Sequence, residues 1–207
     1  MSPPGWDESE RRTGTAPSTA GLVLAAGAGT RFGPEGKLLS KLDGRPVLEW
    51  AVAVACGVAE LRKVVVVVGF HAQEILDQVG FGRAEPVLCE DWADGQSASL
   101  RCGLTALTGW ERVIVTLGDQ PRMTSRVISL FLDQPAGARA VYAGRPGHPV
   151  VLGPEEVTAA MSVGGDVGAR DLVRGGPVIE VGHLCSGRDV DTLEDLEALR
   201  HEARAVI

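Results

Sequence analysis

Short apolar runs alternate with segments of helical periodicity along most of the chain. Residues 64–68 are all valine, which is typical of a strand buried on both faces of a sheet. By contrast, Leu100, Leu104 and Leu107 recur at the spacing of one helical face. The two patterns together predict strands at 21–26, 63–68, 85–89 and 112–117, and helices at 46–55, 72–79, 97–107 and 125–132.

This order of elements predicts an α/β fold with three α/β/α layers, Rossmann-like, with a mostly parallel central sheet. Alternating strands and helices give this arrangement because the connecting helices cover both faces of the sheet. The later part of the chain is less regular, with short strands expected at 140–143, 149–152 and 178–181. A final helix is expected over 192–204, with Thr192 as its N-cap and Asp195 at the capping-box position.

Composition limits the classes of protein that need to be considered. Residues 1–19 are rich in Ser, Thr, Pro, Gly and charge, and we expect a disordered tail there, followed by one domain over 20–207. The net charge of -7 argues against binding to nucleic acid. No apolar run is long enough to cross a membrane and the N-terminus does not resemble a signal peptide, so we expect no membrane contact and a cytoplasmic location.

A glycine-rich loop follows the first predicted strand. Gly27, Gly29 and Gly33 allow a tight turn that brings backbone N–H groups close to a ligand, and Arg31 and Lys37 add two cations. Amides and cations together suit a triphosphate, and ligands of open α/β sheets bind at the carboxyl ends of strands. The spacing matches neither the Walker A nor the Rossmann dinucleotide motif. A purely structural glycine loop is the alternative.

Two acidic positions extend this interpretation. Asp119 comes almost directly after the strand 112–117, where a carboxylate would point into the ligand crevice. Asp191 precedes the final helix, and Asp189 would point the same way if the segment is extended. The alternatives are a turn-forming role for Asp119 and a helix-capping role for Asp191.

The loop at 22–33, together with Lys37, resembles the signature of the cofactor and sugar nucleotidyltransferases. The rest of the chain is most similar to the molybdenum cofactor cytidylyltransferases, which are related to the molybdenum cofactor guanylyltransferases. The segments that carry this resemblance follow the family's order at 90–100, 118–121, 147–150, 165–170 and 189–192. One departure is that three residues, rather than two, separate the last loop glycine from Lys37, which leaves Lys41 as an alternative cation.

The resemblance implies a nucleotidyltransferase fold and a Mg²⁺-dependent transfer of CMP from CTP to molybdopterin, with release of pyrophosphate. It implies catalytic roles for Arg31, Lys37 and Asp119, and binding of Mg²⁺ by Asp119 and Asp191, with Asp189 as the alternative second ligand. The nucleotide-binding residues that it implies are Leu24, Ala25, Ala26, Gly27, Gly29, Gly95 and Ser97. The acceptor-binding residues are His148, Pro149, Asp166, Gly168 and Arg170.

Several alternatives stay open from the sequence. The motif at 25–27 resembles the cytidine-using members, and the methyl group of Ala26 would favour a pyrimidine, but a GTP-using molybdopterin enzyme and a sugar- or polyol-phosphate transferase are alternatives. Ser97 could instead cap a helix, and His148 could be a hydrogen-bonded turn residue. A non-catalytic carrier for a molybdoenzyme is a further alternative, although carriage needs no metal-triphosphate site. Transient docking with a molybdoenzyme or its chaperone is the protein contact that the resemblance implies.

Overall fold

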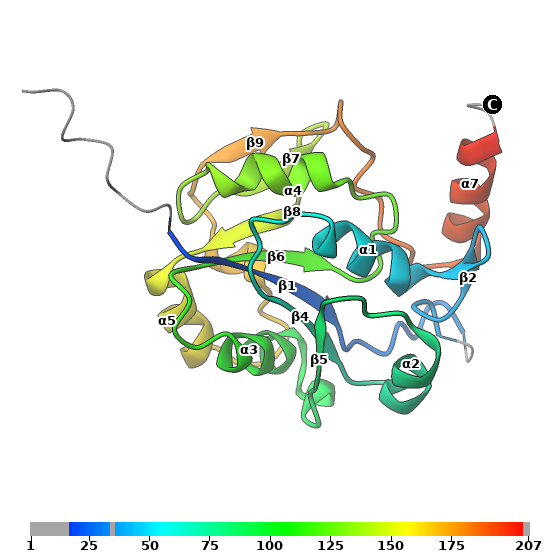
Figure 1. Cartoon of the computed structure of the whole chain (residues 1–207), viewed down its shortest axis with the longest axis horizontal. Helices are drawn as coiled ribbons and strands as arrows, with labels where there is room; N and C mark the ends of the chain where they lie inside the picture. The colour runs from blue at the N-terminus through cyan, green and yellow to red at the C-terminus, as the bar shows by residue number, and fades with distance from the viewer. Residues whose placement is uncertain (1–16, 34–35, 205–207) are drawn as a thin grey trace, which may run out of the picture.

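In the computed structural model, which describes residues 17–33 and 36–204, a seven-stranded sheet forms the centre of the molecule (Figure 1). Its order is β5-β4-β1-β6-β8-β7-β9, and β8 alone runs antiparallel to its neighbours. This confirms the mostly parallel sheet. The strands are β1 Thr19–Ala25, β4 Val64–Val68, β5 Glu85–Leu88, β6 Arg112–Leu117, β7 Arg139–Tyr142, β8 Arg145–Leu152 and β9 Val178–Glu180.

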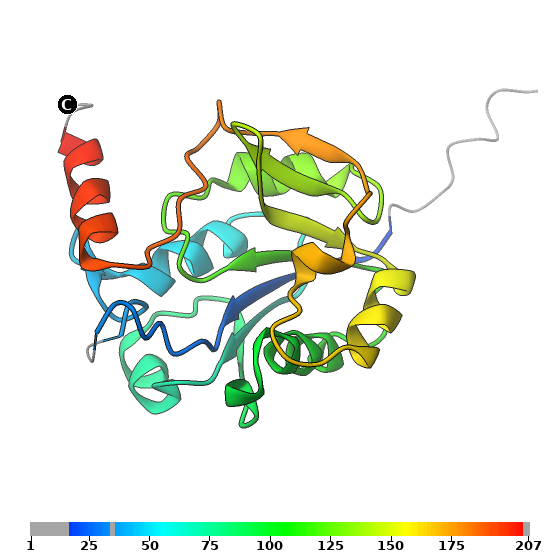
Figure 2. The ribbon, with the colours of Figure 1, turned by 180° about the vertical axis from the view of Figure 1, so that it is seen from behind.

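Helices cover both faces of this sheet, as Figure 2 shows from behind. One face carries α1 (Val47–Cys56), α2 (Ala72–Gln78) and α4 (Ser125–Leu132), and the other carries α3 (Gln96–Ala106), α5 (Pro154–Ser162) and α6 (Ala169–Leu172). The valines of β4 alternate between the two apolar clusters, with Val66 in the first and Val67 in the second. The three predicted layers are therefore confirmed. No helix of the described ranges is both long and apolar enough to span a bilayer.

Strand β1 begins slightly earlier than predicted. Strand β1 starts at Thr19, and the backbone N–H of Ser18 donates a hydrogen bond of 2.7 Å to the carboxylate of Glu111. The strand starts two residues before the predicted range of 21–26, because pairing with β6 extends it beyond its most apolar residues. The tail expected at residues 1–16 lies outside the described residues.

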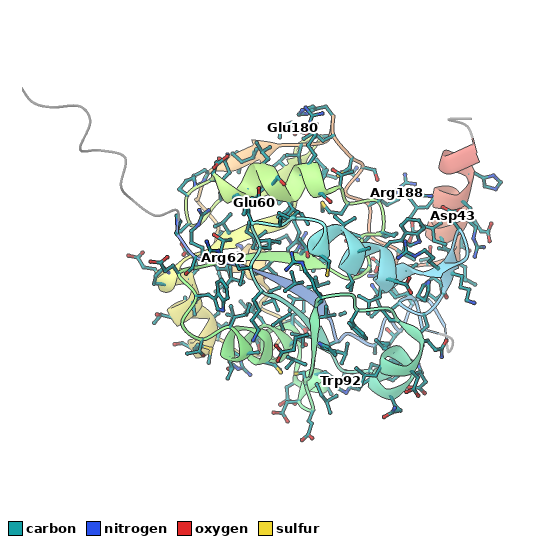
Figure 3. The ribbon with its side chains drawn as sticks, viewed as in Figure 1. Asp43, Glu60, Arg62, Trp92, Glu180 and Arg188 are labelled. Atoms are coloured by element: carbon teal, nitrogen blue, oxygen red, sulfur yellow. The ribbon has the colours of Figure 1, made fainter. Side chains whose placement is uncertain are left out.

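The C-terminal helix α7 (Leu193–Arg204) packs against a small hairpin formed by β2 (Lys41–Leu42) and β3 (Arg45–Pro46). Arg122 joins the two, donating hydrogen bonds to Asp43 (3.0 Å, labelled in Figure 3) and to the carbonyl oxygen of Leu199 (3.2 Å). The predicted capping box is confirmed, since Thr192 and Asp195 bind each other's backbone N–H groups. A third apolar cluster holds α7 in place and consists of Phe32, Leu42, Val47, Val190, Leu196 and Leu199.

Some elements have no counterpart among the sequence predictions. The hairpin β2–β3 has two-residue strands and α6 has four residues, which is too short for periodicity to be visible. Strand β8 starts at Arg145, four residues earlier than predicted, because Gly and Pro at positions 146, 147 and 149 hide the strand pattern. Helix α5 starts with Pro154 at its first turn, a signal that the sequence does contain.

Candidate active site

A cleft of about 540 Å³ opens at the carboxyl ends of β1 and β6. The chain order reverses here, because β4 lies on one side of β1 and β6 on the other, and such switch points are where α/β sheets bind ligands. The predicted residues that line the cleft are Leu24, Ala25, Ala26, Gly27, Gly29, Arg31, Lys37, Gly95, Asp119, His148, Asp166, Arg170 and Asp191. Residues far apart in the sequence are therefore brought together as the resemblance implies.

The glycine loop carries Lys37 into this cleft. Gly29 has a positive φ of 56°, and a Cβ atom there would lie 3.1 Å from the Lys37 side chain. Glycine thus serves two purposes, because it adopts the left-handed conformation and leaves room for the lysine to cross the loop. Gly118 is similarly required at the end of β6, where a Cβ atom would lie 2.7 Å from Leu48.

Two cations and two carboxylates form a connected network at the centre of the cleft. The Lys37 Nζ atom lies 2.5 Å from Asp119 Oδ2 and 3.0 Å from Asp191 Oδ1. Arg31 Nη2 contacts the other oxygen of Asp191 at 2.8 Å. Burial alone would lower the pKa of Lys37, but Asp119 and then Asp191 outweigh it, so the pKa lies above its usual 10.5. The structure places Lys37, and not the exposed Lys41 on β2, at the carboxylates.

The carboxylates fit a divalent cation that also binds phosphate. Asp119 Oδ1 is buried and has no hydrogen-bond partner within the described part of the chain, so it is available to a cation. In the same residues, no group of three or more His, Cys, Asp or Glu side chains forms a complete metal-binding set. Mg²⁺ commonly takes one or two protein carboxylates and completes its shell with phosphate oxygens and water. The donor set therefore suits Mg²⁺ shared with a nucleotide.

Asp189 lies beside the network but has different partners. Gln120 Nε2 donates a hydrogen bond of 2.7 Å to Asp189 Oδ1 and another of 3.1 Å to the carbonyl oxygen of Gly187. Burial, followed by the negative charge of Asp119, raises the pKa of Asp189 to about 6. Asp191 contacts both cations, whereas Asp189 is held by Gln120, so Asp191 is the better candidate for the second metal ligand.

The N-terminus of α3 forms the opposite wall of the cleft. Helix positions 96 and 99 share one face, and both Gln96 and Ser99 line the cleft. Ser97 does not line it, because its side chain is fully buried and its backbone N–H donates to Gly165 O at 3.0 Å. Ser97 is not the N-cap either, since Gly95 holds that position. The N-cap interpretation of Ser97 is therefore wrong, because the helix starts at residue 96, whereas its role in nucleotide binding stays a prediction.

On the acceptor side the structure separates the predicted residues into two groups. His148, Asp166 and Arg170 line the cleft, whereas Pro149 and Gly168 do not. Gly168 instead caps α6, its N–H donating to Asp171 Oδ2 at 3.0 Å. His148 lies in β8 rather than in a turn. Cleft-lining residues that sequence reasoning missed are Ala28, Leu38, Trp92, Ala93, Gln96, Ser99, Leu117 and Ala169.

Known proteins resemble this chain along most of its length. A family model described as the MobA-like NTP transferase domain matches residues 21–183. The chain is 31% identical to nicotine blue oxidoreductase of Paenarthrobacter nicotinovorans, over 88% of this chain and 97% of that protein. A crystal structure of the Mycobacterium tuberculosis Rv0371c homologue from Mycobacterium sp. strain JC1 has a TM-score of 0.80 and 28% identity, covering 92% of this chain and 98% of that one. Rv0371c of M. tuberculosis H37Rv in complex with manganese has a TM-score of 0.72 and 26% identity, with coverages of 89% and 98%.

Proposed function

The chain belongs to the MobA-like NTP transferase family, and from this premise and the geometry of the cleft we propose that it transfers CMP from CTP to molybdopterin, releasing pyrophosphate. The observation that carries the proposal is the contact of Lys37 with both Asp119 and Asp191, directly beside the glycine loop. A triphosphate needs backbone amides, cations and a metal site at one place, and this cleft offers all three.

The chemistry requires positioning and charge neutralisation more than covalent participation by the protein. An acceptor phosphate oxygen attacks the α-phosphorus of CTP in line, the bond to the β-phosphate breaks, and pyrophosphate leaves. The attacking phosphate is already ionised near neutral pH, so no general base is needed.

The carboxylates and the cations of the network have different tasks in this reaction. Asp119 and Asp191 would hold Mg²⁺, which supplies positive charge against the phosphate oxygens. With a metal held by these carboxylates, the ammonium of Lys37 would be free to bind the phosphates of CTP. Arg31 is largely exposed beside it, and both cations stabilise the charge that develops on pyrophosphate.

The packing of the loop supports CTP as the donor. Ala25 and Ala26 are almost fully buried, and the Ala26 methyl group cannot move aside without disturbing the core packed beneath β1. A methyl group at this position narrows the space available to the base and favours the smaller pyrimidine.

Hydride transfer is the second candidate, because a relative with nearly full coverage carries the name nicotine blue oxidoreductase. A redox reaction does not require two carboxylates in contact with a lysine and an arginine at a glycine loop. The geometry therefore favours nucleotidyl transfer. Oxidation of NADH or NADPH by the purified protein, without pyrophosphate release from any NTP, would favour the redox candidate instead.

The decisive experiment measures pyrophosphate release from each of the four NTPs with molybdopterin and Mg²⁺. We expect turnover with CTP and its loss, by about 10³-fold, in Asp119→Asn, because that change removes a carboxylate that would hold Mg²⁺ and so weakens the positive charge at the reacting phosphates. Asp77→Asn, on the exposed surface of α2, is the matched control and should behave as wild type.

Each alternative has its own signature when the experiment is repeated with sugar and polyol phosphates as acceptors and combined with an assay of molybdoenzyme activation. Preference for GTP would overturn the choice of base, and turnover only with a sugar or polyol phosphate would overturn the acceptor. A carrier would instead retain its effect on a molybdoenzyme in the Asp119→Asn variant. Transient docking with such an enzyme or its chaperone, to deliver the product, is part of the proposal.

A further inference from the structure

Two cysteines lie close together beside the α3 wall of the cleft. Cys89 directly follows β5, and Cys102 belongs to α3. Cys102 Sγ donates a hydrogen bond of 3.4 Å to the carbonyl oxygen of Leu88, the residue covalently joined to Cys89. Both cysteines also pack in the same apolar cluster and line one hollow of about 620 Å³ between β5, α3 and Met161 of α5. Packing therefore makes neighbours of two thiols that residues 90–101 separate in the chain.

The two thiols differ in their access to solvent. Cys89 is 3% exposed, whereas Cys102 is partly exposed and lines the hollow. Burial, followed by the interaction with the Cys89 thiol, raises the pKa of Cys102 to about 11, and the charge of Asp91 acts in the same direction. Because the thiolate is the reactive form, a reagent in solution reaches Cys102 first and reacts with it slowly near neutral pH.

The segment between these cysteines forms one wall of the cleft. It connects the end of β5 to the first turns of α3 through the short 3₁₀ helix Trp92–Asp94. The cleft-lining residues of this segment are Trp92, Ala93, Gly95, Gln96 and Ser99. A covalent bond between Cys89 and Cys102 would close the segment into a ring and reduce the number of conformations open to it. Two thiols that do not line the cleft could thus determine how freely its wall moves.

We propose that Cys89 and Cys102 are a redox modification site, at which a reversible disulfide bond joins the end of β5 to α3. The oxidant is a low-molecular-weight disulfide of the glutathione class. The Cys102 thiolate attacks one of its sulfur atoms, forms a mixed disulfide and releases one thiolate. Cys89 then attacks Cys102 Sγ, and the second thiolate leaves. The two protein thiols lose two electrons and two protons, the oxidant becomes two thiols, and an excess of reduced thiol reverses the reaction.

The other two cysteines provide a comparison within the same chain. Cys56 Sγ donates to the carbonyl oxygen of Phe81 at 3.6 Å, and Cys185 Sγ donates to Tyr142 Oη at 4.0 Å. Both contact an oxygen atom rather than a second thiol. They should therefore stay out of any disulfide under conditions that join Cys89 to Cys102.

Peptide mapping tests whether the bond forms. The full chain is incubated with oxidised glutathione at pH 8.5, where more thiolate is present than at neutral pH, and is then digested without reduction for mass spectrometry. We expect wild type to lose two of its four free thiols and to yield peptides joined through Cys89 and Cys102. Cys102→Ser keeps a donor for Leu88 O and should form no bond, whereas the control Cys56→Ser should form it as wild type does.

Hydrogen–deuterium exchange tests whether the bond restrains the wall. In oxidised wild type, we expect the backbone amides of residues 92–99 to exchange about tenfold more slowly than in the reduced protein, because local opening of a closed ring gains less entropy. The amides of α4 should not change. Dithiothreitol should restore the original rates, and Cys102→Ser should exchange equally before and after treatment.

Two results would overturn the inference. One is absence of the bond, seen as four intact thiols, as glutathione that remains on Cys102, or as a bridge through Cys56 or Cys185. The other is unchanged or faster exchange at residues 92–99 in the bridged protein, which would show that the bond does not restrain the wall. Neither experiment needs a nucleotide or an acceptor, so the outcome is independent of the proposed function.

Discussion

Lys37 and Arg31 together balance the negative charge of Asp119 and Asp191. Lys37 is 13% exposed and contacts Asp119 Oδ2 and Asp191 Oδ1 together, so a divalent cation bound by both carboxylates would compete with its ammonium group. The phosphates of a nucleotide offer that ammonium group a replacement partner. Metal and nucleotide binding should therefore support each other through this one side chain.

Replacing Lys37 by methionine should consequently increase metal affinity while it abolishes efficient turnover. Without the competing ammonium, we expect the nucleotide-free protein to bind Mn²⁺ about tenfold more tightly, a change of about 1.4 kcal/mol. Turnover with CTP should fall by about 10²-fold, because a cation is lost from the phosphates. Electron paramagnetic resonance of free Mn²⁺ measures the first effect.

Lys41→Met is the control for this variant, because Lys41 is exposed on β2, outside the cleft lining. It should leave both Mn²⁺ binding and turnover unchanged. Unchanged or weaker Mn²⁺ binding by Lys37→Met would show that the lysine does not compete with the metal.

At the scale of elements, α7 supports one half of the proposed metal site. Leu196 and Leu199 of this helix pack in the same apolar cluster as Phe32 of the glycine loop and Val190. Val190 is the neighbour of Asp191, and its backbone N–H donates to Asp119 O at 2.9 Å. The helix thus links the glycine loop to both carboxylates, although it lines none of the cleft itself.

Truncating Leu199 to alanine should therefore weaken nucleotide binding from a distance. The side chain is fully buried, so the loss of packing should cost about 2–4 kcal/mol, either globally or as local release of α7. We expect a weaker affinity for CTP with Mg²⁺ by calorimetry. Leu193→Ala, on the same helix but 57% exposed, should change neither stability nor affinity. Destabilisation of Leu199→Ala with unchanged CTP affinity would contradict this role of α7.

The long periodic elements were predictable from the sequence, and the irregular ones were not. The all-valine β4 and the helix α4 follow the expected patterns at nearly every position. Strand β8 was predicted only in part, because Pro and Gly interrupt it, and helix α6 was not predicted, because it spans a single turn. These two irregular elements supply His148 and Arg170. Sequence patterns therefore predicted the structure of the acceptor side less well than that of the rest of the site.

For the whole molecule, one continuous sheet separates two apolar clusters of comparable size. Each cluster uses alternate residues of the same strands, such as Val64 and Val65, so neither can lose its packing without exposing the other. If residues 20–207 form one domain, as the sequence predicts, the two clusters should unfold together.

Unfolding in urea should accordingly occur in one transition. Tryptophan fluorescence sums the signals of the four tryptophans, among them Trp50, which packs in the cluster of α7, and Trp110, which packs on the α3 face. Far-ultraviolet circular dichroism reports on all helices and strands. We expect the two curves to coincide, and CTP with Mg²⁺ to shift both to higher urea by the same amount. Separate midpoints would show that the chain contains two independently unfolding units.

The candidate active site is assembled by the sheet as a whole. The glycine loop, Asp119 and Asp191 lie far apart in the chain and meet because the sheet order places β1 next to β6. Sequence motifs predicted which of these residues would meet, through the family resemblance. They could not distinguish Ser97 from Gln96 and Ser99, because a single-residue change in where a helix starts turns a different face toward the ligand.

The reversed direction of β8 has a consequence for how such proteins diversify. Because β8 runs against β6, the turn between β7 and β8, at residues 143–144, projects from the same edge as the cleft. Insertions or deletions there would reshape the acceptor side without interrupting any of the parallel strands that carry the glycine loop and Asp119. This hairpin is thus the position at which evolution, or a protein engineer, could exchange the acceptor and keep the nucleotide chemistry intact.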